Sequence, residues 1–114
     1  MPLLKIETNQ DVEELARNRV IAKASQQVAT MLGKPERYVM VSLQINPSMI
    51  FAGGHEPLAY LELKSIGLPQ ARTAELSAGL ADLMKAELGL PADRIYIEFS
   101  DAPRTMWGWN STTF

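Results

Sequence analysis

Hydrophobic residues recur along the chain at two different spacings, and together these spacings predict a mixed α and β fold. Apolar residues alternate with polar ones or form short runs in four segments that we interpret as strands: residues 3–6, 38–45, 58–66 and 94–99. Apolar residues three and four positions apart predict one helix between the polar residues 8–11 and Gly33, and a second over residues 70–88. Gly33 and Gly89 directly follow these helices, where glycine commonly ends a helix.

Three further expectations concern the arrangement of these elements. We expect the strand at residues 38–45 at the centre of the sheet, and a short additional strand at Met49–Ala52. Residues 53–57 are rich in glycine and predict an irregular loop. The tail from Pro103 to Phe114 is rich in aromatic residues and follows the last strand.

The chain contains an internal repeat, which is its strongest architectural signal. The halves cover about residues 1–56 and 57–114, and each reads as strand, helix, strand. Matching positions are Pro2 and Pro57, Gly33 and Gly89, and Pro35 and Pro91. Two βαβ units side by side predict a single α+β domain over residues 1–114: a four-stranded mixed sheet with two antiparallel helices on one face.

The other face of that sheet is expected to carry apolar residues as well. Such a face must be covered, so the sequence predicts a homo-oligomer in which sheets from several subunits bury one another. Short strands and sheet edges would then pair between subunits.

Composition excludes several classes of function. The 114 residues are 46% hydrophobic and 21% charged with a net charge of −2, so no basic surface is expected and nucleic acid is not a predicted partner. There is no cysteine, hence no disulfide, thiol nucleophile or thiolate metal site. No apolar run is long enough for a membrane span and no secretory leader is recognisable, so the expected location is the cytoplasm, without membrane association.

The candidate for chemistry is Pro2. If a processing peptidase removes Met1, Pro2 carries a free secondary amine. An α-amino group titrates near ~7.7–8.0, and burial beside another cation would lower that pKa, because both disfavour the protonated form. A neutral amine at pH 7 can remove a proton from carbon. The alternative interpretation is that Pro2 merely precedes a strand.

His55 is the only histidine and lies beside Gly53 and Gly54. With no second histidine or cysteine, it is more simply a solvated loop residue than a metal ligand or a catalytic base. The glycine pair also lacks the longer signature of a phosphate-binding loop. We therefore predict neither a metal site nor a cofactor.

Several motifs together resemble one known family. They are Pro2 at the start, Gly33-Lys34-Pro35, Ser65-Ile66-Gly67, Asp93 to Ile97, and the ending Gly108-Trp109-Asn110-Ser111 through Phe114. In this combination the chain is similar to macrophage migration inhibitory factor and D-dopachrome tautomerase, which are branches of the tautomerase superfamily. The resemblance covers essentially the whole chain, with single-residue gaps in loops.

The resemblance implies a homotrimer with an active site at each subunit boundary. It implies keto–enol tautomerisation of phenylpyruvate-like aromatic 2-keto acids and of a non-physiological dopachrome ester, without a cofactor. Pro2 would be the general base, and Lys34 and the backbone amide of Ile66 would hold the carboxylate or the developing oxyanion. Tyr96 would come from the neighbouring chain. The rings expected to line an apolar slot for the substrate are Tyr38, Trp109 and Phe114.

Two departures from the family pattern bear on activity. Glu98 stands where the animal cytokine has an asparagine, two residues after Tyr96 and on the same face of the strand. In the pocket, this carboxylate would raise the pKa of Pro2 and repel an acidic substrate. Leu58–Leu61 replaces a Cys-x-x-Cys pair, so thiol–disulfide activity is excluded.

Two other functions remain as alternatives. One is a cytokine-like binding protein, secreted without a signal peptide, that acts on a host receptor and has a vestigial catalytic pocket. The other is decarboxylation or dehalogenation of a small acid, as in sister branches that place extra arginines around the proline. Arg37, Arg72 and Arg104 are scattered over turns and helix starts, which weighs against it. Without the resemblance, the pattern would suggest a ferredoxin-like ligand-binding module that works with Pro2 changed.

Overall fold

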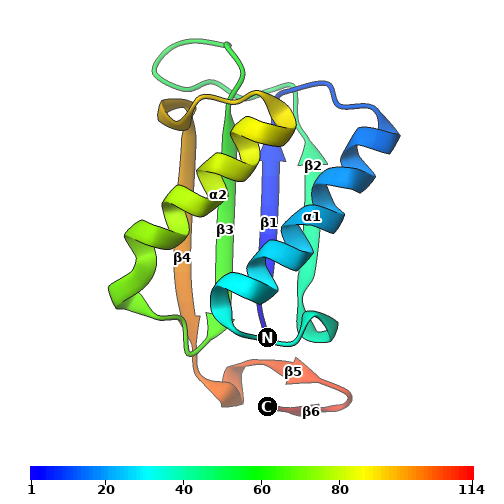
Figure 1. The fold of residues 1–114 in the computed structure, drawn as a ribbon, viewed down its shortest axis with the longest axis vertical. Helices are drawn as coiled ribbons and strands as arrows, with labels where there is room; N and C mark the ends of the chain where they lie inside the picture. The colour runs from blue at the N-terminus through cyan, green and yellow to red at the C-terminus, as the bar shows by residue number, and fades with distance from the viewer.

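The computed structural model describes residues 1–114 as a four-stranded sheet with both helices packed on one of its faces (Figure 1). The bounds of the main elements are β1 Leu3–Thr8, α1 Glu14–Leu32, β2 Met40–Ile45, β3 Ala59–Ile66, α2 Thr73–Leu88 and β4 Ile95–Ala102. The tail adds a small hairpin of β5 Gly108–Trp109 and β6 Thr112–Thr113. Neither helix combines the length and the apolar character needed to cross a membrane.

The order of strands in the sheet is β2-β1-β3-β4. β1 is parallel to β2, β3 is parallel to β4, and the two halves meet along the antiparallel pair β1 and β3. The prediction of two βαβ units in an α+β fold is confirmed. The expectation that residues 38–45 form a central strand is wrong, because the second half joins the free side of β1 and leaves β2 at an edge.

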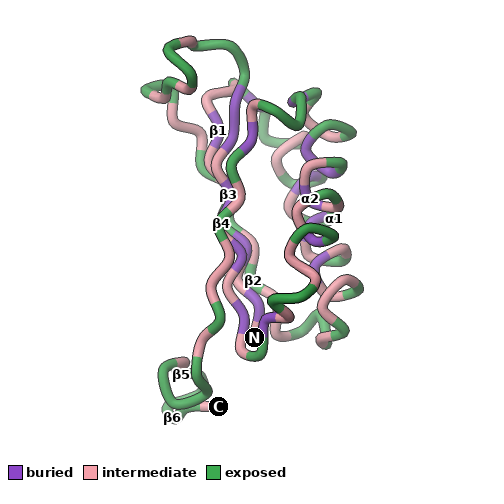
Figure 2. Tube along the Cα trace, turned by 90° about the vertical axis from the view of Figure 1, so that its left-hand side faces the viewer, coloured by how far each residue is buried: buried purple, intermediate pink, exposed green.

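The hydrophobic core lies between the sheet and the two helices (Figure 2). Alternate residues of the central strands are fully buried, among them Leu4, Ile6, Leu61 and Leu63. The helices contribute residues at three- and four-residue spacing: Val20, Ala24 and Val28 from α1, and Leu76, Leu80, Leu83 and Met84 from α2. Full burial of one such leucine or valine stabilises the fold by about 1.5–3 kcal/mol, so the hydrophobic pattern determines which face of each strand meets the helices.

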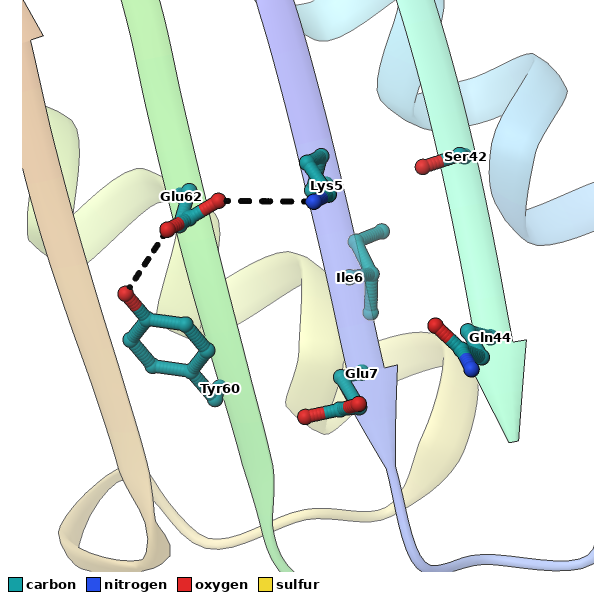
Figure 3. Close-up of a pocket in the computed structure, with 7 residues that line it drawn as sticks. All are labelled: Lys5, Ile6, Glu7, Ser42, Gln44, Tyr60 and Glu62. Carbon is teal, nitrogen blue, oxygen red and sulfur yellow. Dashed lines mark hydrogen bonds and ion pairs between the residues drawn. The ribbon is translucent and has the colours of Figure 1, made fainter. Parts of the chain in front are cut away.

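The opposite face of the sheet is mostly polar, which corrects the expectation of an apolar face in need of cover. Its middle is lined by Lys5, Glu7, Ser42, Gln44, Tyr60 and Glu62 (Figure 3). The Nζ atom of Lys5 lies 3.8 Å from Oε2 of Glu62, and the hydroxyl of Tyr60 lies 3.0 Å from Oε1 of the same residue. Because charged and hydrogen-bonded groups fill the positions between the core residues, this face can remain in contact with water.

The loop between β2 and β3 lies at the far end of the sheet from the N-terminus and is held by Arg94 (Figure 1). The Arg94 guanidinium donates hydrogen bonds to four backbone carbonyls: those of Phe51 (2.8 Å), Gly54 (3.3 Å), Glu56 (2.9 Å) and Pro57 (3.4 Å). The strand expected at Met49–Ala52 is reduced to an isolated bridge between Phe51 and Gly54, whose carbonyls also accept hydrogen bonds from Arg94. The Phe51 ring packs 4.6 Å from the Tyr96 ring.

Candidate active site

The sheet end where β1 begins is also the meeting point of segments from distant parts of the chain (Figure 1). The C-terminal end of α1, the end of β3 and the aromatic tail all reach it. Pro2 lies directly before β1 and is fully buried, and its carbonyl oxygen accepts a 3.0 Å hydrogen bond from the amide of Met40 on β2. Backbone pairing therefore fixes the position of Pro2 from its first peptide group.

Pro2 lies in the wall of a cavity of about 360 Å³, which falls in the usual size range of small-molecule sites. Three rings form the apolar side of this pocket. The Tyr38 ring lies edge-to-face against Trp109 and Phe114, with centroid distances of 5.5 and 5.8 Å. Trp109 and Phe114 stack at 5.5 Å with an angle of 10° between their planes. Flat rings around a narrow space suit a planar aromatic or conjugated ligand.

Two turns bring these rings together. Pro35 leads from the end of α1 into a single 3₁₀ turn, Glu36–Tyr38, which sets Tyr38 just before β2. In the tail, Asn110 and Ser111 have positive φ values of 52° and 66°, which fold β5 back on β6. The amide of Phe114 then donates to the carbonyl of Trp107 at 3.2 Å. Phe114 therefore lines the same pocket as Pro2.

The terminal amine in the structure belongs to Met1, and its pKa is lower than that of an ordinary α-amino group. Burial is the largest cause, because an apolar wall disfavours the ammonium form, and the charges of Lys34 and Arg104 lower this pKa further. Lys34 is set in place by the end of α1, where Gly33 adopts a left-handed backbone with φ 63° and the Lys34 amide donates to the carbonyl of Ala29. Met1 lines the pocket and lies one residue from the nitrogen of Pro2.

The arginines are not scattered, which corrects the argument made from the sequence. Arg37 lines the pocket, and its guanidinium lies over the Tyr38 ring, 4.8 Å from the ring centroid. Arg104 opens the short turn that leads into Trp107, close enough for its charge to act on the terminal amine. Of these three arginines, only Arg72 lies away from the pocket. It donates hydrogen bonds to the carbonyl of Met31 and to Glu75.

Ile66 ends β3 at the same end of the sheet. β3 runs antiparallel to β1 with Lys64 opposite Leu3, so the residues after Lys64 lie beside the start of the chain. The following turn is held by Gly67, whose φ of 70° favours glycine, and by Asp101. Oδ1 of Asp101 accepts hydrogen bonds from the amides of Gly67 (2.9 Å) and Leu68 (3.1 Å). The backbone that borders Ile66 is thus fixed in position.

Tyr96 and Glu98 lie away from the Pro2 pocket in the folded chain. Tyr96 pairs with Tyr60 and Tyr60 with Glu7, which places Tyr96 toward the opposite end of the sheet from Pro2. Its side chain is 66% exposed in the single subunit. Glu98 is on the polar sheet face, where its Oε2 accepts a 2.8 Å hydrogen bond from the Tyr60 hydroxyl. Within one subunit, Glu98 therefore does not enter the Pro2 pocket.

The structure thus brings six of the predicted site residues to one end of the sheet and leaves two apart. Those together are Pro2, Lys34, Tyr38, Ile66, Trp109 and Phe114; those apart are Tyr96 and Glu98. Sequence reasoning missed Arg37, Met40, Arg104 and Trp107. The position of Arg37 next to Tyr38 was a usable signal, whereas nothing local reveals that the tail returns to the N-terminus. His55 is exposed, as predicted for a solvated loop residue.

These features combine a terminal amine of lowered pKa, cationic side chains and an apolar slot. An amine that is neutral near pH 7 can accept a proton from carbon, and neighbouring cations can stabilise the negative charge that then forms on oxygen. The fold and the pocket together define an α+β protein of two βαβ units with an aromatic pocket at the start of β1.

Comparison with known proteins assigns the chain to a family. The sequence model of the family described as macrophage migration inhibitory factor matches residues 1–114. A macrophage migration inhibitory factor homolog of Brugia malayi is 36% identical over 116 residues, spanning 100% of this chain and 99% of the relative. The chain belongs to the macrophage migration inhibitory factor family.

Solved structures agree with this assignment. The macrophage migration inhibitory factor homologue from Prochlorococcus marinus superposes with a TM-score of 0.92 at 45% identity, over 98% of each chain. The macrophage migration inhibitory factor from Trichinella spiralis superposes with a TM-score of 0.90 at 32% identity, over 98% of this chain and 99% of that one.

Proposed function

We propose that this protein is a cofactor-independent keto–enol tautomerase that acts on phenylpyruvate-like 2-keto acids and on dopachrome. Family membership supports a tautomerase or cytokine-like function in general. The observation that carries the specific proposal is the buried Pro2, which lies in the wall of an aromatic pocket, next to the Met1 amine whose pKa burial and the charge of Lys34 lower.

In the proposed reaction, a peptidase first removes Met1, which frees the secondary amine of Pro2 and clears the part of the pocket that Met1 lines. The neutral amine takes a proton from the carbon next to the keto group. The electron pair of the broken C–H bond forms the C=C bond, and the keto oxygen becomes an enolate. The ammonium then returns the same proton to that oxygen. One proton changes place, so atoms and electrons balance without a cofactor.

Lys34 and the backbone amide of Ile66 are the proposed groups that stabilise the charge during this transfer. A cation fixed beside the reacting oxygen lowers the energy of the enolate more than that of the neutral ketone. Tyr38, Trp109 and Phe114 would hold the substrate ring in the apolar slot. Water is then excluded from one side of the reacting carbon.

We further propose a homotrimer, with Tyr96 of a neighbouring subunit completing each site. This is supported by the position of Tyr96, which is exposed and distant from Pro2 within its own chain. The edge strands β2 and β4 also have unpaired backbone groups on their outer sides, which neighbouring chains can pair with.

The test is the enol-to-keto conversion of phenylpyruvate, followed by ultraviolet absorbance, in the wild type and in a Pro2→Gly variant whose N-termini are verified by mass. We expect kcat/KM to fall by roughly 10²–10⁴-fold in the variant, the typical contribution of a positioned base. Equal activity in both proteins would show that Pro2 is not the base. A wild type without activity would refute the proposed function.

A second candidate function is binding to a receptor protein of a host. The relatives from Brugia malayi and Trichinella spiralis carry the name macrophage migration inhibitory factor homolog, which describes an effect on cells. A receptor-binding role would persist in the Pro2→Gly variant. Binding to a host receptor can be compared between the same wild-type and variant preparations that are used for the activity assay.

A further inference from the structure

Three cationic side chains gather at the Pro2 pocket without an ion pair. They are Lys34, Arg37 and Arg104, and none lies within bridging distance of a carboxylate. Other cations of the chain do find carboxylates, for example Lys23 with Glu87 at 3.0 Å. The chain as a whole has a net charge of −2, so an excess of positive charge at one site does not follow from composition. A ligand with a single carboxylate would pair with only one of these three cations.

These cations occupy two different places. Lys34 and Arg104 act on the terminal amine, where the reacting end of a substrate would lie. Arg37 lines the pocket on its aromatic side, with its guanidinium over the Tyr38 ring. A ligand that extends from the amine along the rings would therefore meet positive charge at both of its ends.

No acidic side chain compensates this charge inside the pocket, because neither Asp nor Glu is among the lining residues. Two acidic groups lie nearby in the chain. Glu36 is exposed in the turn that contains Arg37, and Asp101 accepts hydrogen bonds from the amides of Gly67 and Leu68. A cleft lined with charge of one sign concentrates ligands of the opposite sign.

We propose that the preferred substrate is a 2-keto acid with a second anionic group at the end remote from the keto acid, and that Arg37 recognises this group. This inference rests on the proposed tautomerase function. The planar guanidinium presents paired donors that fit a carboxylate and remains charged at any working pH. Phenylpyruvate, whose ring end is uncharged, would leave Arg37 without a partner.

The test compares phenylpyruvate with its ring-carboxylated analogue, which carries a carboxylate para to the keto-acid side chain. The proteins are the wild type, Arg37→Gln, and Arg19→Gln as a control that removes the same charge from the surface of α1. We expect the wild type to favour the charged substrate in kcat/KM by about tenfold, as for a hydrogen bond to a charged partner. Arg37→Gln should abolish this preference, while Arg19→Gln should retain it.

Binding separates this inference from the proposed function. Cinnamate and 4-carboxycinnamate are unreactive analogues, and their affinities can be measured by calorimetry without any turnover. Tighter binding of the dicarboxylate, lost in Arg37→Gln, would support the inference even if no tautomerase activity were found. Equal affinities, or a preference unchanged in Arg37→Gln, would overturn it. A preference seen only in a Glu98→Gln variant would also overturn it, because a neighbouring Glu98 would then be the natural partner of Arg37.

Discussion

At the scale of single residues, the decisive group is the terminal amine, whose protonation state sets whether the pocket contains a base. In the structure this amine is that of Met1, and burial, Lys34 and Arg104 each lower its pKa. We expect the same causes to lower the pKa of the Pro2 amine once Met1 is removed. The neutral, reactive form therefore becomes available at a lower pH than in an unfolded chain. Activity should rise with pH through this lowered pKa, and the rising limb of the pH profile reports on it directly.

Lys34→Gln tests this effect of charge. Removing a neighbouring cation stabilises the ammonium form, so the pKa of the amine should rise and the rising limb of kcat/KM should move to higher pH. Because the enolate also loses a partner, kcat should fall by roughly 10²–10³-fold at the pH optimum. The measurement is a pH series with phenylpyruvate.

Two further variants sharpen the result. Arg104→Gln should also move the rising limb of kcat/KM to higher pH, since the charge of Arg104 acts on the amine as well. Arg72→Gln should leave it in place, because Arg72 contacts Glu75 and Met31 instead. A limb that stays at the same pH in both Lys34→Gln and Arg104→Gln would contradict the proposed electrostatics.

At the scale of elements, the loop between β2 and β3 depends on one side chain. Arg94 reaches four carbonyls of this loop and places the Phe51 ring against Tyr96. Arg94→Met removes these donors and leaves the Pro57 carbonyl without a partner, while the carbonyls of Phe51 and Gly54 keep only the hydrogen bonds from each other's amides. We expect a loss of about 2–3 kcal/mol in the free energy of unfolding, the usual effect of losing hydrogen bonds to a charged group.

Hydrogen exchange localises the effect of that variant. Amide protection should fall selectively over residues 51–57 and stay unchanged in α1 and in the strand pair β1 and β3. If protection fell evenly across the chain, Arg94 would be acting on global stability and the loop would not be an element held by this side chain.

At the scale of the whole molecule, the distance between Pro2 and Tyr96 makes the proposed site a shared one. Mixing and refolding a Pro2→Gly variant with a Tyr96→Ala variant should restore activity, because a site that takes Pro2 from the Tyr96→Ala chain and Tyr96 from the Pro2→Gly chain contains both native residues. For equal amounts in a cyclic trimer, about one quarter of the sites are intact by random assembly. Sedimentation verifies the trimers, and no recovery in mixed trimers would place both residues in one chain.

Much of this architecture could be predicted from local sequence pattern. The spacing of Leu76, Leu80 and Met84 defines one buried helix face, and the repeat predicts two βαβ units. Strand order could not be predicted in the same way, because it depends on which side of β1 the second half joins. Alternation along Lys5 and Glu7 already indicated a polar face, which the expectation of an apolar one overlooked.

The site was predictable only in part for a similar reason. Pro2, Tyr38 and Phe114 were identified by resemblance, and the structure places them around one pocket. Arg104 was missed, because its approach to the N-terminus depends on the fold of the tail and on the contact between Phe114 and Trp107. Contacts between the two ends of a chain leave no local pattern in the sequence.

The most direct test of the account is phenylpyruvate tautomerase activity in two forms of the same chain, one with Met1 removed and one with Met1 retained. Both forms keep every residue of the sheet and every pocket residue except Met1, and mass spectrometry establishes which form is which. With Met1 retained, the Pro2 nitrogen is part of an amide and cannot accept a proton. We predict activity in the processed form alone. Equal activity in both forms, or none in the processed one, would contradict the role of Pro2 as the base.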